Sequence, residues 1–208
     1  MEVIHYIFYR SEMVQRLFFE HLFLIIVSVG IAIIIGVSLG VLISYFKLLA
    51  SPVLTACQVL MTIPSIAMLG LLLPLSGIGF QTGVIALILY SLLPIVRNTY
   101  SGIAEIDKAI IESARGMGMT DFKILFKIKL PLAFPVIMAG IRTATVMVVG
   151  IGAIAAYIGA GGLGELIFNG ISRTNQPMII TGAIFISIIA IFFDLLLSWL
   201  EKRKTIKY

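Results

Sequence analysis

The chain has 208 residues, of which 60% are hydrophobic and only 12% are charged, and its formal net charge is +5. A mean hydropathy of +1.13 excludes an ordinary soluble domain. The single cysteine, Cys57, excludes a disulfide bond within the chain, and its place in an apolar stretch predicts a buried thiol.

Apolar stretches predict an all-α, polytopic membrane protein with about five transmembrane helices. We expect these helices at residues 22–46, 53–73, 80–96, 132–158 and 178–200. They form one transmembrane domain, 22–200, between an N-terminal segment, 1–21, and a basic tail, 201–208. The N-terminal segment mixes acidic and basic residues, which is not typical of a signal peptide. His5 and His21 have no partners at metal-ligand spacing, and we expect both at the surface.

The first expected span carries a small residue at every fourth position. These residues are Ser28, Ala32, Gly36, Gly40 and Ser44. The stripe predicts close approach of another helix, and a substrate groove is the alternative.

The second expected span is interrupted at Thr62-Ile63-Pro64-Ser65. Pro64 removes a backbone donor, so it is expected to kink or break the helix. Broken helices at membrane depth often line cavities, which makes Thr62, Pro64 and Ser65 pathway candidates. The alternative is a packing kink stabilised by Thr62 or Ser65.

Between the third and fourth spans lies a charged loop, about residues 97–131, with several residues at fixed spacing. These are Glu112, Ser113, Ala114, Gly118, Ile128, Leu130 and Pro131. Apolar residues at helical spacing predict one short helix, which Gly118 can end by taking a positive φ. Thr120 or Asp121 can cap a second helix, and Pro131 suits the first turn of the next span.

This spacing resembles the EAA loop of permease subunits of binding-protein-dependent ABC importers, with Ser113 replacing an alanine. The resemblance implies the type I ABC importer transmembrane fold and a cytoplasmic loop that docks onto a separate ATPase subunit. It implies as partners two ATPase subunits, a second permease chain (identical or related), an extracytoplasmic binding protein and the lipid bilayer. It implies no catalysis and no cofactor on this chain, since ATP-Mg would bind the partner ATPase.

After the fourth span, glycines recur at Gly159, Gly161, Gly162 and Gly164. No lysine follows at the spacing of a phosphate-binding loop, so a flexible turn at a gate is the expectation. Segments 61–72, 92–103 and 155–171 resemble the osmoprotectant branch of these permeases, which imports glycine betaine, choline or carnitine. The methionine branch shares the glycine tract and is the alternative. Tyr90, Tyr157 and Phe168 are candidates for contact with the cation.

Two charges fall inside the expected spans, Arg142 and Asp194. Arg142 either lines the pathway, pairs with a carboxylate or lies at the inner interface. Asp194 is expected to reach the interface or to pair with Lys202. A secondary transporter or channel is the rival class, but it would need mid-membrane carboxylates or an internal repeat. A membrane enzyme is disfavoured because no catalytic set is present.

The distribution of basic residues predicts the orientation in the bacterial cytoplasmic membrane. With the charged loop inside, the N-terminus lies outside and the C-terminus inside. Eleven basic residues are then inside: Lys47, Arg97, Lys108, Arg115, Lys123, Lys127, Lys129, Lys202, Arg203, Lys204 and Lys207. Three are outside: Arg10, Arg16 and Arg173. Membrane orientation thus explains the positive charge, and no nucleic-acid partner is expected.

Overall fold

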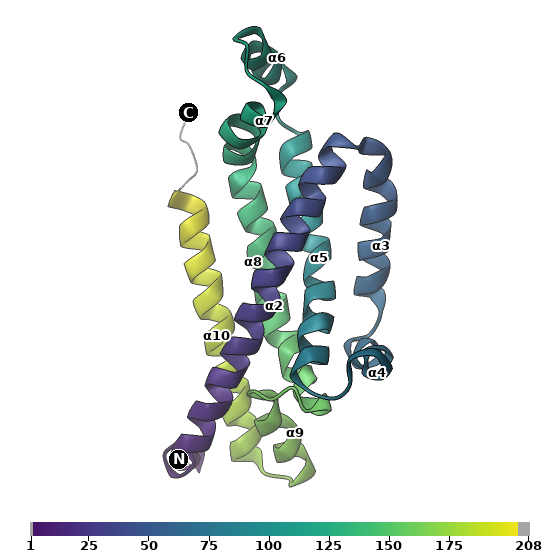
Figure 1. Ribbon diagram of the computed structural model, residues 1–208. Coiled ribbons are helices and arrows are strands. Elements are labelled where there is room, and N and C mark those ends of the chain that lie inside the picture. The colour runs from purple at the N-terminus through teal and green to yellow at the C-terminus, as the bar shows by residue number, and fades with distance from the viewer. Residues whose placement is uncertain (1, 204–208) are drawn as a thin grey trace.

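The computed structural model describes residues 2–203, and every regular element in that range is a helix. The long helices run side by side between two ends of the molecule (Figure 1). One end carries α1 (Glu2–Tyr9) and α9 (Gly164–Ser172), and we call it the α9 end. The opposite end, which we call the α6 end, carries α6 (Lys108–Gly116) and α7 (Asp121–Ile124). The predicted all-α class is confirmed.

Four of the predicted spans are confirmed as long apolar helices. They are α2 (Ser11–Tyr45), α5 (Phe80–Ala104), the continuous helix Asp121–Ile158 and α10 (Gln176–Arg203). The continuous helix consists of α7, η2 (Leu125–Lys129), α8 (Leu130–Ala155) and η3 (Ala156–Ile158). α2 begins well before residue 22, because Val14 and Leu17 already pack into the core. Of the predicted tail, residues 204–208 lie outside the described range.

The second predicted span is not one helix. It consists of α3 (Ala50–Thr62), which follows the short η1 (Lys47–Leu49), and α4 (Ser65–Ser76), and the two are bent by 103°. Between them Ile63 has an extended backbone, with φ −68° and ψ 127°. Pro64 explains the break, since it cannot donate a helical hydrogen bond and disfavours a helical residue before it. α3 alone rises about 20 Å, less than the hydrocarbon thickness of a bilayer.

The stripe of small residues on α2 packs against α5. A Cβ atom on Gly36 would lie 2.7 Å from Ile95 Cγ2, and one on Gly40 would lie 2.5 Å from Thr99 Cβ. Only glycine permits this approach of the two backbones. The predicted helix contact is therefore confirmed, and the stripe does not form an open groove.

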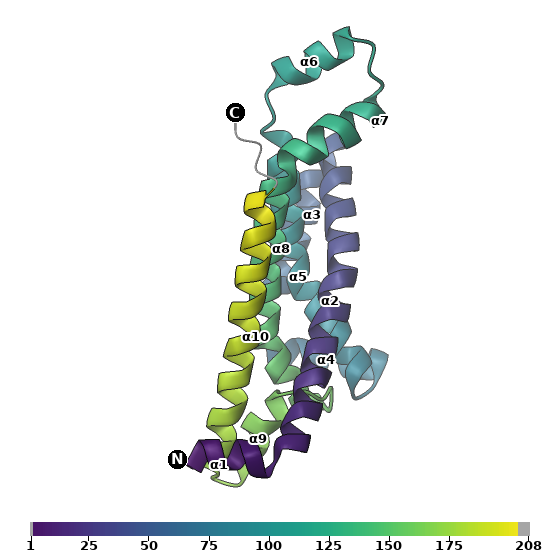
Figure 2. The same cartoon turned by 90° about the vertical axis from the view of Figure 1, so that its left-hand side faces the viewer.

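α8 packs against α5 on one side and against α10 on another (Figure 2). At Gly140, a Cβ atom would lie 2.7 Å from the carbonyl oxygen of Pro94, so α5 and α8 also approach closely. Cys57 is buried, as predicted, between α3 and α5. The result is a bundle that holds the α6–α7 loop at one end and the glycine tract at the other (Figures 1 and 2).

Candidate functional site

The charged loop folds into two short helices, which we call the hairpin (residues 105–130). Asp107 caps α6, its Oδ1 accepting a hydrogen bond from the Ala109 N–H at 2.9 Å. Thr120 caps α7 as predicted, its Oγ1 accepting from the Lys123 N–H at 3.4 Å. Both caps satisfy N–H groups that a helix start leaves unpaired, so the local sequence alone defines where each helix begins.

Gly118 ends α6 with a φ of +78°, as the sequence predicted. The N–H of Gly118 donates to the Arg115 carbonyl at 2.9 Å, and that of Met119 donates to the Ala114 carbonyl at 3.1 Å. These two bonds make a Schellman motif, which turns the chain sharply after the helix. Gly118 therefore sets the direction in which the chain leaves α6.

The two helices of the hairpin bury one residue each. Ala114 of α6 and Ile124 of α7 are both buried. Arg115 and Asp121 join the two helices through an exposed ion pair of 3.0 Å, which adds little stability in water. Glu112 and Ser113 are exposed on the other side of α6.

The outer side of the hairpin presents large apolar side chains. Met117 is 75% exposed and Phe122 is 72% exposed, and Ile110 and Phe126 are exposed as well. The rings of Phe122 and Phe126 lie 4.6 Å apart. A cluster of this kind, surrounded by charged residues, is typical of a surface that binds another protein.

The hairpin continues into α8 without a break, which the sequence did not predict. Residues 125–129 form a single π-helical turn, in which the Leu130 N–H donates to the Leu125 carbonyl. Pro131 follows directly, in the first turn of α8. Because Pro131 cannot donate to the carbonyl of Lys127 and crowds it, a wider turn is the local solution. Ile128 and Leu130 are half-buried and Pro131 is exposed.

At the break between α3 and α4, the hydroxyl of Tyr90 donates a hydrogen bond to the Ile63 carbonyl. Tyr90 is only 3% exposed, so it supports the break instead of facing an open path. Thr62 Oγ1 donates to the Val59 carbonyl at 2.7 Å, within the last turn of α3. These contacts favour a packing kink stabilised by Thr62 over a break that lines an open pathway. Pro64 itself is exposed and Ser65 half-buried.

The glycine tract forms a tightly packed turn. Gly159, Gly161 and Gly162 have φ values of +77°, +80° and +88°. At Gly164 a Cβ atom would lie 1.9 Å from the Ala153 carbonyl oxygen. Glycine is thus needed here for backbone conformation and for close approach, and the flexibility expected of the turn stays a prediction.

Glu20 and His21 of α2 hold this glycine turn. The Gly162 N–H donates to Glu20 Oε2 at 3.2 Å, and a Cβ atom on Gly162 would lie 2.9 Å from His21 Nδ1. His21 is fully buried, and its Nε2 lies 3.2 Å from the Val149 carbonyl oxygen. The predicted surface position of His21 is therefore wrong. Leu17, His21 and Leu24 share one buried helix face at 3–4-residue spacing, which could have indicated burial.

Arg142 pairs with carboxylates of α10, one of the alternatives left open. It donates to both oxygens of Asp194, at 2.6 and 3.0 Å, and lies 3.6 Å from Glu201. The expected pairing of Asp194 with Lys202 is wrong, because the guanidinium fits the carboxylate with two bonds. The three charged groups border a cavity of about 490 Å³ between α8 and α10, together with Ala139, Thr143, Val146 and Met147.

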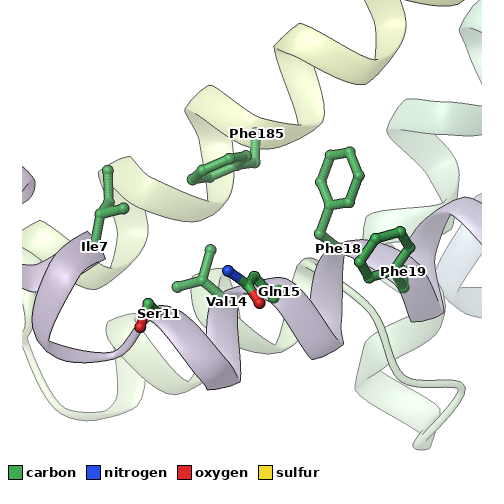
Figure 3. Close-up of a pocket in the computed structure, with 7 residues that line it drawn as sticks. All are labelled: Ile7, Ser11, Val14, Gln15, Phe18, Phe19 and Phe185. Carbon is green, nitrogen blue, oxygen red and sulfur yellow. The ribbon is translucent and has the colours of Figure 1, made fainter.

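A second cavity of about 490 Å³ lies between α1, α2 and α10 (Figure 3). Phe18, Phe19 and Phe185 line it with four further residues, of which only Ser11 and Gln15 are polar. It offers no convergent polar groups for a small polar solute. No group of three or more potential metal ligands comes together within residues 2–203.

The predicted candidates therefore separate into four places. Tyr157 and Phe168 lie together beside the glycine turn, with ring centroids 5.6 Å apart. Tyr90 lies at the break with Thr62 and Pro64. Arg142 lies midway along α8, and the hairpin lies at the α6 end. The sequence did not indicate the contact of Glu20 with the turn, nor which carboxylate Arg142 pairs with, since both contacts join segments far apart in the chain.

Comparison with known proteins places this arrangement in a family. Residues 32–206 match the family described as the binding-protein-dependent transport system inner membrane component. The osmoprotectant import permease protein OsmW of Salmonella typhimurium (strain LT2) is 50% identical over 97% of this chain and 96% of its own length. The glycine betaine/carnitine/choline transport system permease protein OpuCD of Bacillus subtilis (strain 168) is 45% identical, over 89% of this chain and 81% of that protein.

Solved structures share the fold. A permease chain of the inward-facing MetNI methionine ABC transporter is 23% identical and aligns with a TM-score of 0.84, over 94% of this chain and 98% of its own. An amino acid ABC transporter solved with histidines is 26% identical, with a TM-score of 0.67 over 94% of this chain and 98% of that chain. The predicted ABC importer transmembrane fold is confirmed.

Proposed function

Because the chain belongs to the family of binding-protein-dependent transport system inner membrane components, we propose that it forms the translocation pathway for a quaternary ammonium compatible solute. Glycine betaine, choline and carnitine are the candidates. The observation that carries the proposal is the near full-length identity of 41–50% to permeases named for osmoprotectants or for these solutes. The chain is a multi-pass protein of the cytoplasmic membrane.

The hairpin is the proposed contact with the ATPase subunit. Exposed Met117 and Phe122 supply apolar area, and exposed Glu112 supplies charge. ATP-Mg would bind the ATPase, and this chain would perform no catalysis. Movement of the ATPase subunits would shift the hairpin, and the pathway would open alternately to each side of the membrane.

We place the α6 end in the cytoplasm and the α9 end outside. This orientation is supported by the basic residues Lys47, Arg115, Lys127 and Lys202, because η1, the hairpin and the last turn of α10, which carry them, lie towards the α6 end. The extracytoplasmic binding protein would then deliver the solute near α9. Most selectivity for a quaternary ammonium group would rest on aromatic rings of that binding protein.

A second permease chain, identical or related, completes the proposed pathway. The Arg142–Asp194–Glu201 group is half-exposed on this chain. Charged side chains at membrane depth normally face protein or water, so it would be unfavourable for this group to face lipid, as it would in a single chain. A partner chain on this face would remove the group from lipid.

Reconstitution tests the solute. The complex of permease, ATPase and binding protein in proteoliposomes should take up radiolabelled glycine betaine, choline or carnitine only when ATP is supplied. Uptake of methionine alone would contradict the proposed solute class. Uptake by the permease without its ATPase would instead favour a secondary transporter.

Cysteine labelling tests the orientation. Glu12→Cys and Ser113→Cys, each in a Cys57→Ser background, place single thiols at exposed positions near the two ends. An impermeant maleimide applied to intact cells should label position 12 and spare position 113 until the membrane is opened. The reverse pattern would overturn the orientation and the cytoplasmic position of the hairpin.

A further inference from the structure

A small cavity of about 320 Å³ lies beside the glycine turn at the α9 end. Glu20 and Phe23 of α2, Phe80 of α5 and Glu165 of α9 line it with the turn Gly159–Gly161. We propose that this cavity binds an ammonium cation, either the quaternary ammonium group of the solute or the headgroup of a lipid. The solute is considered as a ligand because of the proposed function, whereas the binding of an ammonium cation itself does not rest on that function.

The aromatic side of the cavity is a stacked pair of rings. The centroids of Phe23 and Phe80 lie 5.5 Å apart, with an angle of 19° between the planes. Phe23 is 60% exposed and Phe80 37% exposed, so other protein side chains leave much of both rings open. Aromatic rings attract cations, and they offer methyl groups of a quaternary ammonium an apolar contact.

The acidic side of the cavity consists of two carboxylates held differently. Glu20 is fixed by the turn, since its Oε2 accepts the Gly162 N–H at 3.2 Å, and its Oε1 lies 3.7 Å from Arg16 Nε. Glu165 is half-buried, and no residue in the described part of the chain donates to its carboxylate. Arg16 compensates the charge of Glu20, so the negative charge of Glu165 remains without a cation. A partly buried carboxylate without a partner favours a bound cation.

The glycine turn makes this arrangement sterically feasible. A Cβ atom on Gly161 would lie 2.9 Å from Glu20 Oε2, so a larger residue would displace the carboxylate. The φ of +80° at Gly161 also disfavours other residues. The turn thus brings a carboxylate of α2 to the same cavity as the first turn of α9.

Direct binding tests the proposal. The purified complex of permease and ATPase, without binding protein, is placed in nanodiscs of phosphatidylglycerol, whose headgroup has no ammonium. Radiolabelled choline should bind saturably, and its neutral isostere 3,3-dimethyl-1-butanol should not displace it. Glu165→Gln and Phe80→Leu should each weaken choline binding about fivefold or more. Phe80→Tyr keeps the ring and should bind choline like the wild type.

Matched control variants distinguish an effect on the cavity from the general effect of losing a carboxylate or an aromatic ring elsewhere on the protein. Glu12→Gln removes an exposed carboxylate of the same helix, and Phe192→Leu removes an exposed ring of α10. Both should bind choline like the wild type. Equal displacement by the neutral isostere, or unchanged binding by both Glu165→Gln and Phe80→Leu, would overturn the proposal.

A second experiment, with a different lipid, distinguishes a lipid headgroup from the solute as the bound cation. In nanodiscs that contain phosphatidylethanolamine, a lipid occupant should lower choline binding, and native mass spectrometry should find this lipid retained by the wild type but not by Glu165→Gln. Unchanged choline binding in these nanodiscs assigns the cavity to the solute. Absence of both choline binding and lipid retention overturns the proposal. Exclusive methionine uptake by the full complex would overturn the proposed function, yet charge-selective binding in the cavity would stand.

Discussion

Arg142 of α8 and Asp194 of α10 are joined by two hydrogen bonds, with the guanidinium facing both oxygens of the carboxylate. Glu201, two turns further along α10, lies 3.6 Å from the same guanidinium. A single guanidinium thus faces two carboxylates that lie two turns apart on α10. The position of α10 against α8 therefore depends on this group as well as on apolar packing.

We expect Arg142→Met to lower the melting temperature of the purified complex. The substitution keeps the apolar stem but removes the cation to which Asp194 is joined by two hydrogen bonds. Asp194→Asn should cause a smaller loss, since Glu201 still faces the guanidinium. Thr143→Ala, at the neighbouring exposed position, is the control and should melt like the wild type. Identical melting of Arg142→Met and the control would show that the ion pair is dispensable.

Tyr90→Phe removes the donor that satisfies the Ile63 carbonyl at the helix break. A carbonyl left unpaired in an apolar setting costs about 1–3 kcal/mol, so the free energy of unfolding in an SDS titration should fall by this amount. Tyr100→Phe is a matched control on α5, because no residue in the described range bonds to its hydroxyl. Equal stability of the two variants would mean that water or a neighbouring chain satisfies Ile63.

Gly118→Val should weaken the contact between the hairpin and the ATPase subunit without preventing membrane insertion. No atom within 4 Å obstructs a side chain at Gly118, so the penalty comes from the φ of +78° and amounts to about 1–3 kcal/mol locally. Recovery of the ATPase in co-purification, and ATP-driven uptake, should both fall. Gly118→Asn should be milder, because asparagine tolerates this conformation.

Gly116→Ala is the control for Gly118, since Gly116 also has open space but a helical backbone. It should retain the ATPase. Full transport by Gly118→Val with normal ATPase recovery would reduce the hairpin to a linker. Glu112→Lys, which reverses an exposed charge without altering the fold, should weaken the same co-purification if the partner surface is complementary.

Gly162→Ala should destabilise the α9 end. The added Cβ atom would lie 2.9–3.0 Å from His21, and the φ of +88° is unfavourable for alanine, so a loss of at least about 1–3 kcal/mol is expected. Gly150→Ala has open space within a helix and should be neutral or slightly stabilising. The SDS titration of both variants measures the difference, and equal unfolding midpoints would show that α2 moves aside at no cost.

The hairpin was predictable because its signals are local. Gly118 and Thr120 act on backbone groups within five residues, so a single sequence contains the whole cause. The break at Pro64 was predictable for the same reason, although its 103° bend was not. One contact at that bend, the hydrogen bond from the Tyr90 hydroxyl to the Ile63 carbonyl, comes from 27 residues away.

The contacts of the interior were not predictable in this way. His21 meets Val149 across 128 residues, and Glu20 meets Gly162 across 142 residues. Hydropathy places His21 among apolar neighbours but does not say which helix covers it. The pairing of Arg142 with Asp194 likewise requires the rotation of α8 and α10, which periodicity alone does not fix.

The helix from Asp121 to Ile158 has 38 residues, which corresponds to a length of about 57 Å. It begins in the hairpin and ends at the glycine turn, so it connects the two ends of the molecule directly. Its wide turn at residues 125–129 is of a kind at which helices commonly kink, and it lies where the hairpin joins α8. A small push on the hairpin would be absorbed there as local bending. We expect that only a displacement large enough to exhaust this bending would tilt the rest of the helix and move Gly159, so that small movements of the hairpin would not reach the glycine turn.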